Sequence, residues 1–280
     1  METTTPEGLQ RDRKDIGTRA HRGRGGSDKL KGHPRDSPET RFSKTLSWIL
    51  RHGAESEGLP MRADGYVRLT DLFMVNKMRG IDFSTLEKIV QNDNKRRYNL
   101  IREADQLSGS AEEIWWIRAN QGHSLKTVAM ELQPINSVAD IPTGVAVHGT
   151  TRKAWKVICA LNTSLYFEQY SVKNLGVLGE QGLSKMSRNH IHLAQGVPGS
   201  SVISGMRNSS QILVFVDVQK GIDAGIKFYL SANGVVLTEG DDRGFLGPQF
   251  FSRVEDSNRE PLVGWEGIQV PLVSIPGFTR

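Results

Sequence analysis

The chain has 280 residues, of which 37% are hydrophobic and 24% charged; these fractions allow a buried core and exclude a wholly disordered protein. Lys and Arg number 36 against 31 Asp and Glu, and the formal charge of +5 favours a polyanionic partner. The single cysteine, Cys159, excludes a disulfide framework and a cysteine-rich zinc site, and no apolar run approaches the ~18–20 residues of a membrane span.

Residues 1–40 are predicted to form a disordered tail, because they combine Gly, Arg, Asp and Pro with hardly an apolar side chain. RGRGGS at 22–27 can contact nucleic acid, but a solvated tail explains it more simply. The first residues lack an apolar signal core, so we expect the protein in the nucleus or the cytoplasm.

The next segment, 41–127, has the pattern of helices followed by two strands. An apolar stripe that includes Leu46 and Ile49 predicts a helix from Arg41 with a stop at Gly53. A turn, a short strand and a helix start follow in DGYVRLTDLF (64–73), and STLE at 84–87 is interpreted as the capping box of a helix that ends near Gln91. With strands at 96–101 and 113–119, the segment is predicted to be a winged-helix lobe.

The second half is richer in strands than the first. Residues 128–142 are expected to be a connector, and 143–260 a mixed β lobe interrupted by one helix at TRKAWKVICAL (151–161). Asn233-Gly234 lies between two strand-like segments and predicts a hairpin. The predicted fold class is therefore α+β, with a C-terminal extension over 261–280.

Three arginines are candidates for binding an anionic ligand. Arg51 and His52 end the first helix, where the helix dipole alone would favour them, but Arg51 lies opposite the apolar stripe and is free to face a ligand. Arg97 belongs to a basic run, 95–97, which is either a solvated surface or a place where one cation is aimed while its neighbours remain in solvent. Arg188 lies in a span without acids, from Gln181 to Val216.

Histidines accompany these cations. His148 precedes a glycine in VHGT, where backbone can approach a ligand closely, although a core histidine is an equal alternative. His190 and His192 share one face of a predicted strand, but no acid or cysteine completes a zinc set, so no metal is expected. An anion pocket is the better interpretation of this span.

Seven motifs occur together in order: LSWILRHGA, NKRRY, QGHS, VHGT, GLSKMSRNHIHLA, VISGMRNSS and NGVVLTEG. With them the chain resembles, over residues 41–255, the NAD-dependent RNA 2′-phosphotransferases, which finish tRNA splicing in fungi and plants. The resemblance implies that the winged-helix lobe binds RNA and that the second lobe is ADP-ribosyltransferase-like and binds NAD. Residues 162–180 would be an atypical insert in that lobe.

The resemblance also implies the site residues. The essential Arg-His-Arg-Arg set of the family falls on Arg51, His52, Arg97 and Arg188, and the expected NAD-binding residues are His148, Gly149, Thr150, Ser187 and His190. Possible additional residues are Gln121, Gly122, His123, Ser124 and Arg207. The implied substrates are NAD and 2′-phosphorylated tRNA or other RNA, and we expect a monomer with no membrane partner.

Two alternatives remain. The same NAD lobe can ADP-ribosylate a terminal phosphate of RNA or DNA and stop there, or the chain can be a non-catalytic winged-helix RNA-binding protein. NAD binding separates the second of these from an enzyme.

Overall fold

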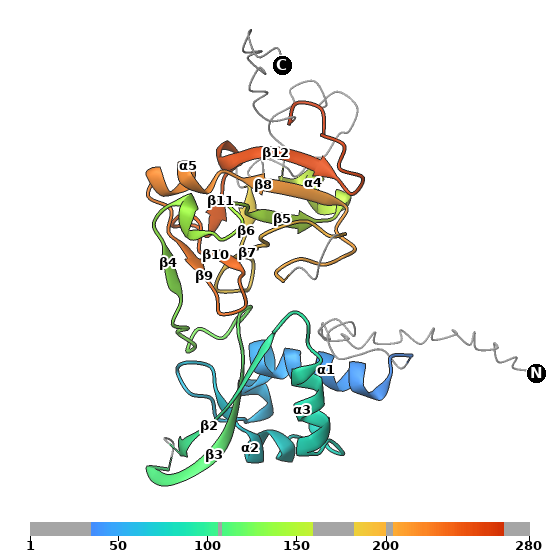
Figure 1. Ribbon diagram of the computed structural model, residues 1–280, viewed down its shortest axis with the longest axis vertical. Helices are drawn as coiled ribbons and strands as arrows, with labels where there is room; N and C mark the ends of the chain where they lie inside the picture. The colour runs from blue at the N-terminus through green and yellow to red at the C-terminus, as the bar shows by residue number, and fades with distance from the viewer. Residues whose placement is uncertain (1–34, 106–107, 159–181, 200–203, 266–280) are drawn as a thin grey trace, which may run out of the picture.

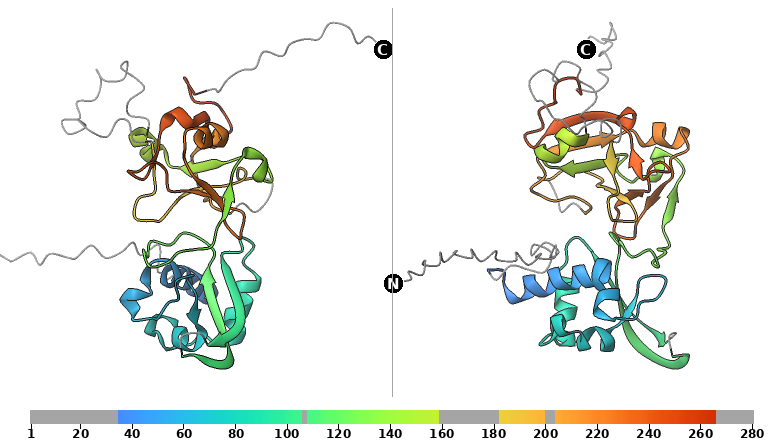
Figure 2. Two further views of the ribbon diagram at one scale, coloured as in Figure 1. Left: turned by 90° about the vertical axis from the view of Figure 1, so that its left-hand side faces the viewer. Right: turned by 180° about the vertical axis from the view of Figure 1, so that it is seen from behind.

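The computed structural model describes residues 35–105, 108–158, 182–199 and 204–265. Two groups of elements lie one above the other along its long axis (Figure 1). The views from the side and from behind show the same division (Figure 2). Most of the expected tail, the segment 162–180 and most of the C-terminal extension lie outside the described residues.

The first group begins with a helix that changes its winding. Helix α1 (Pro38–Trp48) starts at Pro38, not at Arg41 as expected, because Ser37 caps it by accepting a hydrogen bond from Thr40 N at 3.2 Å. It continues as a π-helical turn, Ile49–Gly53, in place of a plain α-helix end. Such turns are frequent at functional sites, and this one carries Arg51 and His52.

The other elements of this group are α2 (Leu69–Met74), α3 (Phe83–Gln91), β1 (Val67–Arg68), β2 (Tyr98–Asp105), β3 (Ser110–Ala119) and the 3₁₀ turns Glu55–Glu57 and Asn76–Met78. Helix α3 is capped by Asp82, which accepts from Thr85 N at 2.8 Å, so the predicted capping box at 84–87 is wrong and the helix starts two residues earlier. The strands form an antiparallel sheet in the order β1-β3-β2. The helices and sheet enclose one core, which includes Leu46, Leu72, Leu86 and Ile117.

The second group is built from short strands. A three-stranded sheet has the order β12-β8-β5, and a four-stranded sheet has the order β4-β9-β10-β7. A third, two-stranded sheet is formed by β11 and β6. The strands are β4 (Gln133–Ile135), β5 (Val147–Thr150), β6 (Leu183–Ser184), β7 (Ile191–Leu193), β8 (Ile212–Val216), β9 (Phe228–Leu230), β10 (Val236–Thr238), β11 (Phe245–Leu246) and β12 (Phe251–Asp256). The helices are α4 (Arg152–Ile158) and α5 (Val218–Asp223), with 3₁₀ turns at Val138–Asp140 and Pro248–Phe250.

Two sequence predictions can be compared directly with this group. The hairpin at Asn233-Gly234 is confirmed, because β9 and β10 pair antiparallel and Gly234 adopts φ +75°. The stretch 128–142 is more than a connector, since β4 lies within it and pairs with β9. The mixed α/β composition of the chain is confirmed. Within the described ranges, no helix is both long and apolar enough to cross a membrane.

Candidate active site

Arg51 is a buried cation. Its Nε and Nη2 atoms are buried and unpartnered among the described residues. Burial lowers the pKa of Arg51 from 12.5 to about 10, and the nearby Arg188 and Arg97 add to the decrease against the opposing effect of Tyr98. A guanidinium held in this way is costly to the free protein and is suited to an anionic ligand.

The segment 121–124 supports Arg51 and His52. Gly122 has φ +90°, and a Cβ placed there would lie 3.4 Å from Arg51 Cδ and Nε, so the chain passes directly along this side chain. Ser124 N donates to the Arg51 carbonyl at 2.9 Å, and the Ser124 hydroxyl lies 2.9 Å from His52 Nδ1. The segment 121–124, expected as a possible addition to the site, therefore contacts both Arg51 and His52.

His52 is held in its neutral form. Burial lowers its pKa to about 4, and Arg188 and Arg51 act in the same direction. The bond to Ser124 occupies Nδ1, which leaves Nε2 for a ligand. An imidazole in this state can donate or accept one hydrogen bond but adds no charge.

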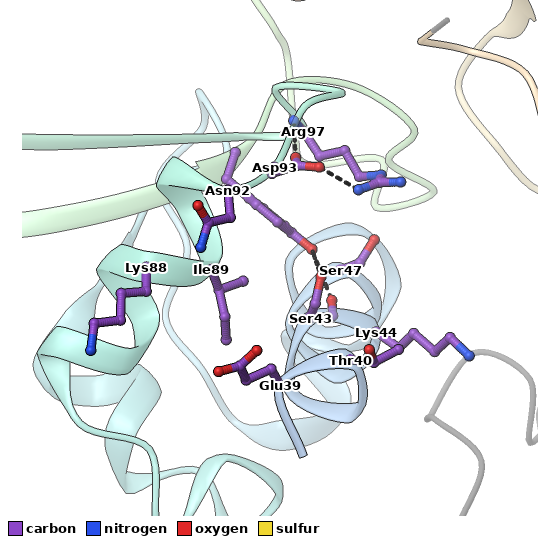
Figure 3. Close-up of a pocket in the computed structure, with 11 residues that line it drawn as sticks. Glu39, Thr40, Ser43, Lys44, Ser47, Lys88, Ile89, Asn92, Asp93 and Arg97 are labelled. Carbon is purple, nitrogen blue, oxygen red and sulfur yellow. Dashed lines mark hydrogen bonds and ion pairs between the residues drawn. The ribbon is translucent and has the colours of Figure 1, made fainter. Parts of the chain in front are cut away.

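Arg97 differs from the expectation of an unpaired cation. Its Nη1 donates to Asp93 Oδ1, and its backbone N–H donates to Asp93 Oδ2 at 2.5 Å. Figure 3 shows this pair at the edge of a cavity of about 440 Å³ between α1 and the end of α3. Sequence reasoning missed Asp93, although it lies four residues before Arg97. The neighbour Lys95 is not in free solvent either, because its Nζ donates to Met206 O at 2.9 Å.

Arg188 approaches from the second group of elements. Burial lowers its pKa, and the exposed Arg207 adds to the decrease. His192 is 6% exposed, its Nε2 is buried without a partner among the described residues, and its pKa lies well below 6.5 because of burial and the charges of Arg188 and Arg51. His192 belongs to the His-x-His pair, but its place beside the arginines could not be inferred from that spacing.

The remaining candidates for NAD binding fall into different surroundings. His148 Nδ1 lies 3.0 Å from His192 O, and Arg188 contributes to lowering its pKa after burial, so His148 joins the cluster. A Cβ at Gly149 would lie 2.4 Å from Ser210 Oγ and 2.5 Å from Met206 Cγ, so the packing of these side chains requires a glycine there, and its contact with NAD stays a prediction. Thr150 ends β5, half-buried.

His190 and Ser187 lie farther along the same segment. Strand β7 begins at Ile191, so His190 precedes it and lines a second cavity, of about 410 Å³, with Tyr229 and Glu239. Ser187 is exposed. Within the described ranges no group of three or more His, Cys, Asp or Glu side chains could hold a metal ion.

The arrangement as a whole is a cation cluster made by both groups of elements. The first contributes Arg51, His52 and Arg97, and the second contributes Arg188 and His192; their charges perturb one another's pKa values. Of the three arginines, one is paired with a carboxylate, which leaves a net positive site lined by neutral imidazoles. This chemistry suits a doubly charged, oxygen-rich anion such as a phosphate monoester.

Comparison with known proteins identifies similar sequences. The family described as "RNA 2′-phosphotransferase, Tpt1 / KptA family" matches residues 37–166 and 161–240. The chain is 39% identical over 240 residues to "tRNA 2′-phosphotransferase 1" of Danio rerio, covering 85% of this chain and 92% of the relative. It is 38% identical to the human protein of the same name, covering 80% and 79%, and 28% identical to "Probable RNA 2′-phosphotransferase" of Rhizobium leguminosarum, covering 75% and 94%.

Proposed function

The chain belongs to the RNA 2′-phosphotransferase (Tpt1/KptA) family, and from this premise we propose that it is a tRNA 2′-phosphotransferase that uses NAD as the acceptor. It transfers the splice-junction 2′-phosphate of ligated tRNA, leaving a 2′-hydroxyl. The other products are nicotinamide and ADP-ribose 1″,2″-cyclic phosphate.

One observation carries the assignment of the phosphate site. Arg51 presents two buried nitrogens that have no partner in the described part of the chain, in a cluster that also holds Arg97 and Arg188. The RNA 2′-phosphate supplies the oxygens that these nitrogens lack, and it is already an anionic nucleophile, so its attack needs no carboxylate base. The arginines hold it, orient it and offset its charge.

His52 contributes a neutral donor beside this phosphate. Because its pKa is about 4, the imidazole enters the complex uncharged. With Nδ1 directed to Ser124, Nε2 can donate to a phosphate oxygen, or it can take the proton of the attacking ribose 2″-hydroxyl and pass that proton to the departing RNA 2′-oxygen.

The second group of elements is suited to NAD. The buried Nε2 of His192 has no partner within the described part of the chain, and His148 lies beside it, so a polar ligand is needed there. We assign His148, Thr150, His190 and His192 to this ligand. When bound, NAD supplies an electrophilic ribose carbon with nicotinamide as the leaving group. In the same proposal, 143–260 is an ADP-ribosyltransferase-like lobe and 41–127 a winged-helix RNA-binding lobe, supported by α1–α3 followed by the β2–β3 pair.

The test is an assay of RNA carrying one internal 2′-phosphate, with and without NAD. We expect nicotinamide and cyclic-phosphate release only when both are present, and loss of that release in Arg188→Ala. Arg79→Ala, which changes an exposed arginine, is the matched control. Phosphate loss without NAD would identify a phosphatase, and a stable ADP-ribosyl adduct would identify an ADP-ribosyltransferase; either result would overturn the proposal.

A further inference from the structure

The two groups of elements are connected near the site by the main chain and side chain of Lys95. Its Nζ donates to Met206 O at 2.9 Å, and its carbonyl accepts from Ser204 Oγ at 2.9 Å and from Asn233 Nδ2 at 3.0 Å. Lys95 comes from the loop between α3 and β2, whereas its three partners belong to the second group. This set of bonds is called the Lys95 joint below.

A second connection, the Asn189 joint, lies next to Arg188. Asn189 N donates to His123 O at 2.9 Å, and Asn189 Nδ2 donates to Leu125 O at 3.1 Å. Lys126 Nζ also donates to Asn189 Oδ1, at 3.3 Å. The partners of this joint follow β3, so the bonds again run between the two groups.

The backbone around the Lys95 joint is held in an uncommon conformation. Arg96, between Lys95 and Arg97, has φ +44°, a region that costs a residue with a side chain about 1 kcal/mol or more. Its carbonyl accepts from Asn120 Nδ2 at 2.7 Å. Strain of this kind persists only where neighbouring contacts fix it, and here it allows Lys95 to face the second group while Arg97 faces Asp93.

Each joint therefore links the chain beside one arginine of the cluster to the opposite group of elements. Lys95 is two residues before Arg97, and Asn189 directly follows Arg188. We propose that Lys95 and Asn189 are positioning residues that set the separation of Arg97 and Arg188, and thereby bring the RNA phosphate and NAD into reacting distance. This inference rests on the proposed function, and neither residue is required to touch a substrate.

The Lys95 joint also reaches the side of the site assigned to NAD. Met206, whose carbonyl accepts from Lys95, packs with its side chain against Gly149 in VHGT. A displacement at Lys95 would therefore move both sides of the site relative to one another. A misplacement of about 1 Å can reduce a rate by about 100-fold without loss of binding energy.

The experiment measures turnover and the two binary affinities in Lys95→Met, which keeps the length of the side chain and removes its donor. We expect kcat to fall about 10- to 100-fold, while the dissociation constants of 2′-phosphorylated RNA and of NAD, each measured alone, stay near wild type. Lys95→Arg, which retains a donor, should recover much of the rate. Asn189→Ala should reproduce the loss, and Lys153→Met, an exposed lysine on α4, is the matched control.

The outcomes are distinct. If Lys95→Met turns over as fast as an active wild type, the inference is overturned and the proposed function stands. If RNA affinity falls as much as kcat, Lys95 is a direct ligand, which also overturns it. An inactive wild type would overturn both proposals. Ser204→Ala removes a single bond of the Lys95 joint and gives the same test should Lys95→Met fail to fold; it should show a smaller fall in kcat with unchanged affinities.

Discussion

Replacing Arg51 by Met should stabilise the free protein and strongly reduce its activity. The pKa of Arg51 is lowered from 12.5 to about 10. At about 1.4 kcal/mol per pKa unit, this corresponds to about 3 kcal/mol against the charged form in the folded state. Methionine has a similar stem and no charge to bury, so the free energy of unfolding should rise by about 1–3 kcal/mol. The missing phosphate contact should lower kcat/KM by about 100-fold or more.

The assay pairs urea unfolding at neutral pH with nicotinamide release from 2′-phosphorylated RNA. Arg79→Met changes an exposed arginine and should leave both measurements near wild type. Inorganic phosphate offers a further check, because it should raise the unfolding midpoint of the wild type more than that of Arg51→Met. An Arg51→Met protein that unfolds at lower urea than wild type, or that keeps turnover within about threefold, would refute the reasoning.

Three further predictions follow from the same contacts. Ser124→Ala removes the partner of His52 Nδ1 and should reduce kcat about tenfold with RNA affinity unchanged; an unchanged kcat would show that this bond does not orient the imidazole. Asp93→Asn keeps an acceptor for the Arg97 N–H but removes the ion pair, so kcat should again fall about tenfold, and full activity would count against an orienting role. Burial lowers the pKa of His123 to about 3, so this residue takes up a proton more readily in the unfolded chain than in the folded one. As the pH is lowered from about 6.5, His123 should therefore reduce the free energy of unfolding by up to about 1.4 kcal/mol per pH unit. His123→Gln should flatten that slope in urea titrations between pH 7 and 4, and an equal slope would contradict the assignment.

The sequence predicted those features that depend on local patterns. The Asn233-Gly234 hairpin follows from the need for a glycine at the positive φ of the turn, and the strands around Val147 and Val214 follow from short apolar runs. The start of α3 was missed because Asp82 and Ser84 are both acceptable caps, and only the backbone shows which one is used.

The site was predictable in its cations and not in their partners. The position of Arg51 opposite the apolar stripe and the lack of acids around Arg188 indicated an anion-binding role, and both have their pKa lowered by burial beside other cations. Arg97 and Asp93 are only four residues apart, yet a solvated surface run of mixed charges has the same appearance in the sequence. The bonds of Lys95 to Met206 and Asn233 join positions more than a hundred residues apart, which no local pattern can reveal.

The central claim is that the arginines hold the RNA phosphate as a dianion. Phosphorus NMR of RNA bearing one 2′-phosphate, titrated with acid in the presence of excess protein, measures this directly. A phosphate monoester ordinarily takes up its proton near pH 6, and surrounding guanidinium groups should lower that pKa in the complex because they favour the charged form. The account predicts a bound phosphate that stays dianionic to lower pH than the free RNA, with the difference lost in Arg188→Ala. An unchanged or raised pKa for the bound phosphate would contradict it.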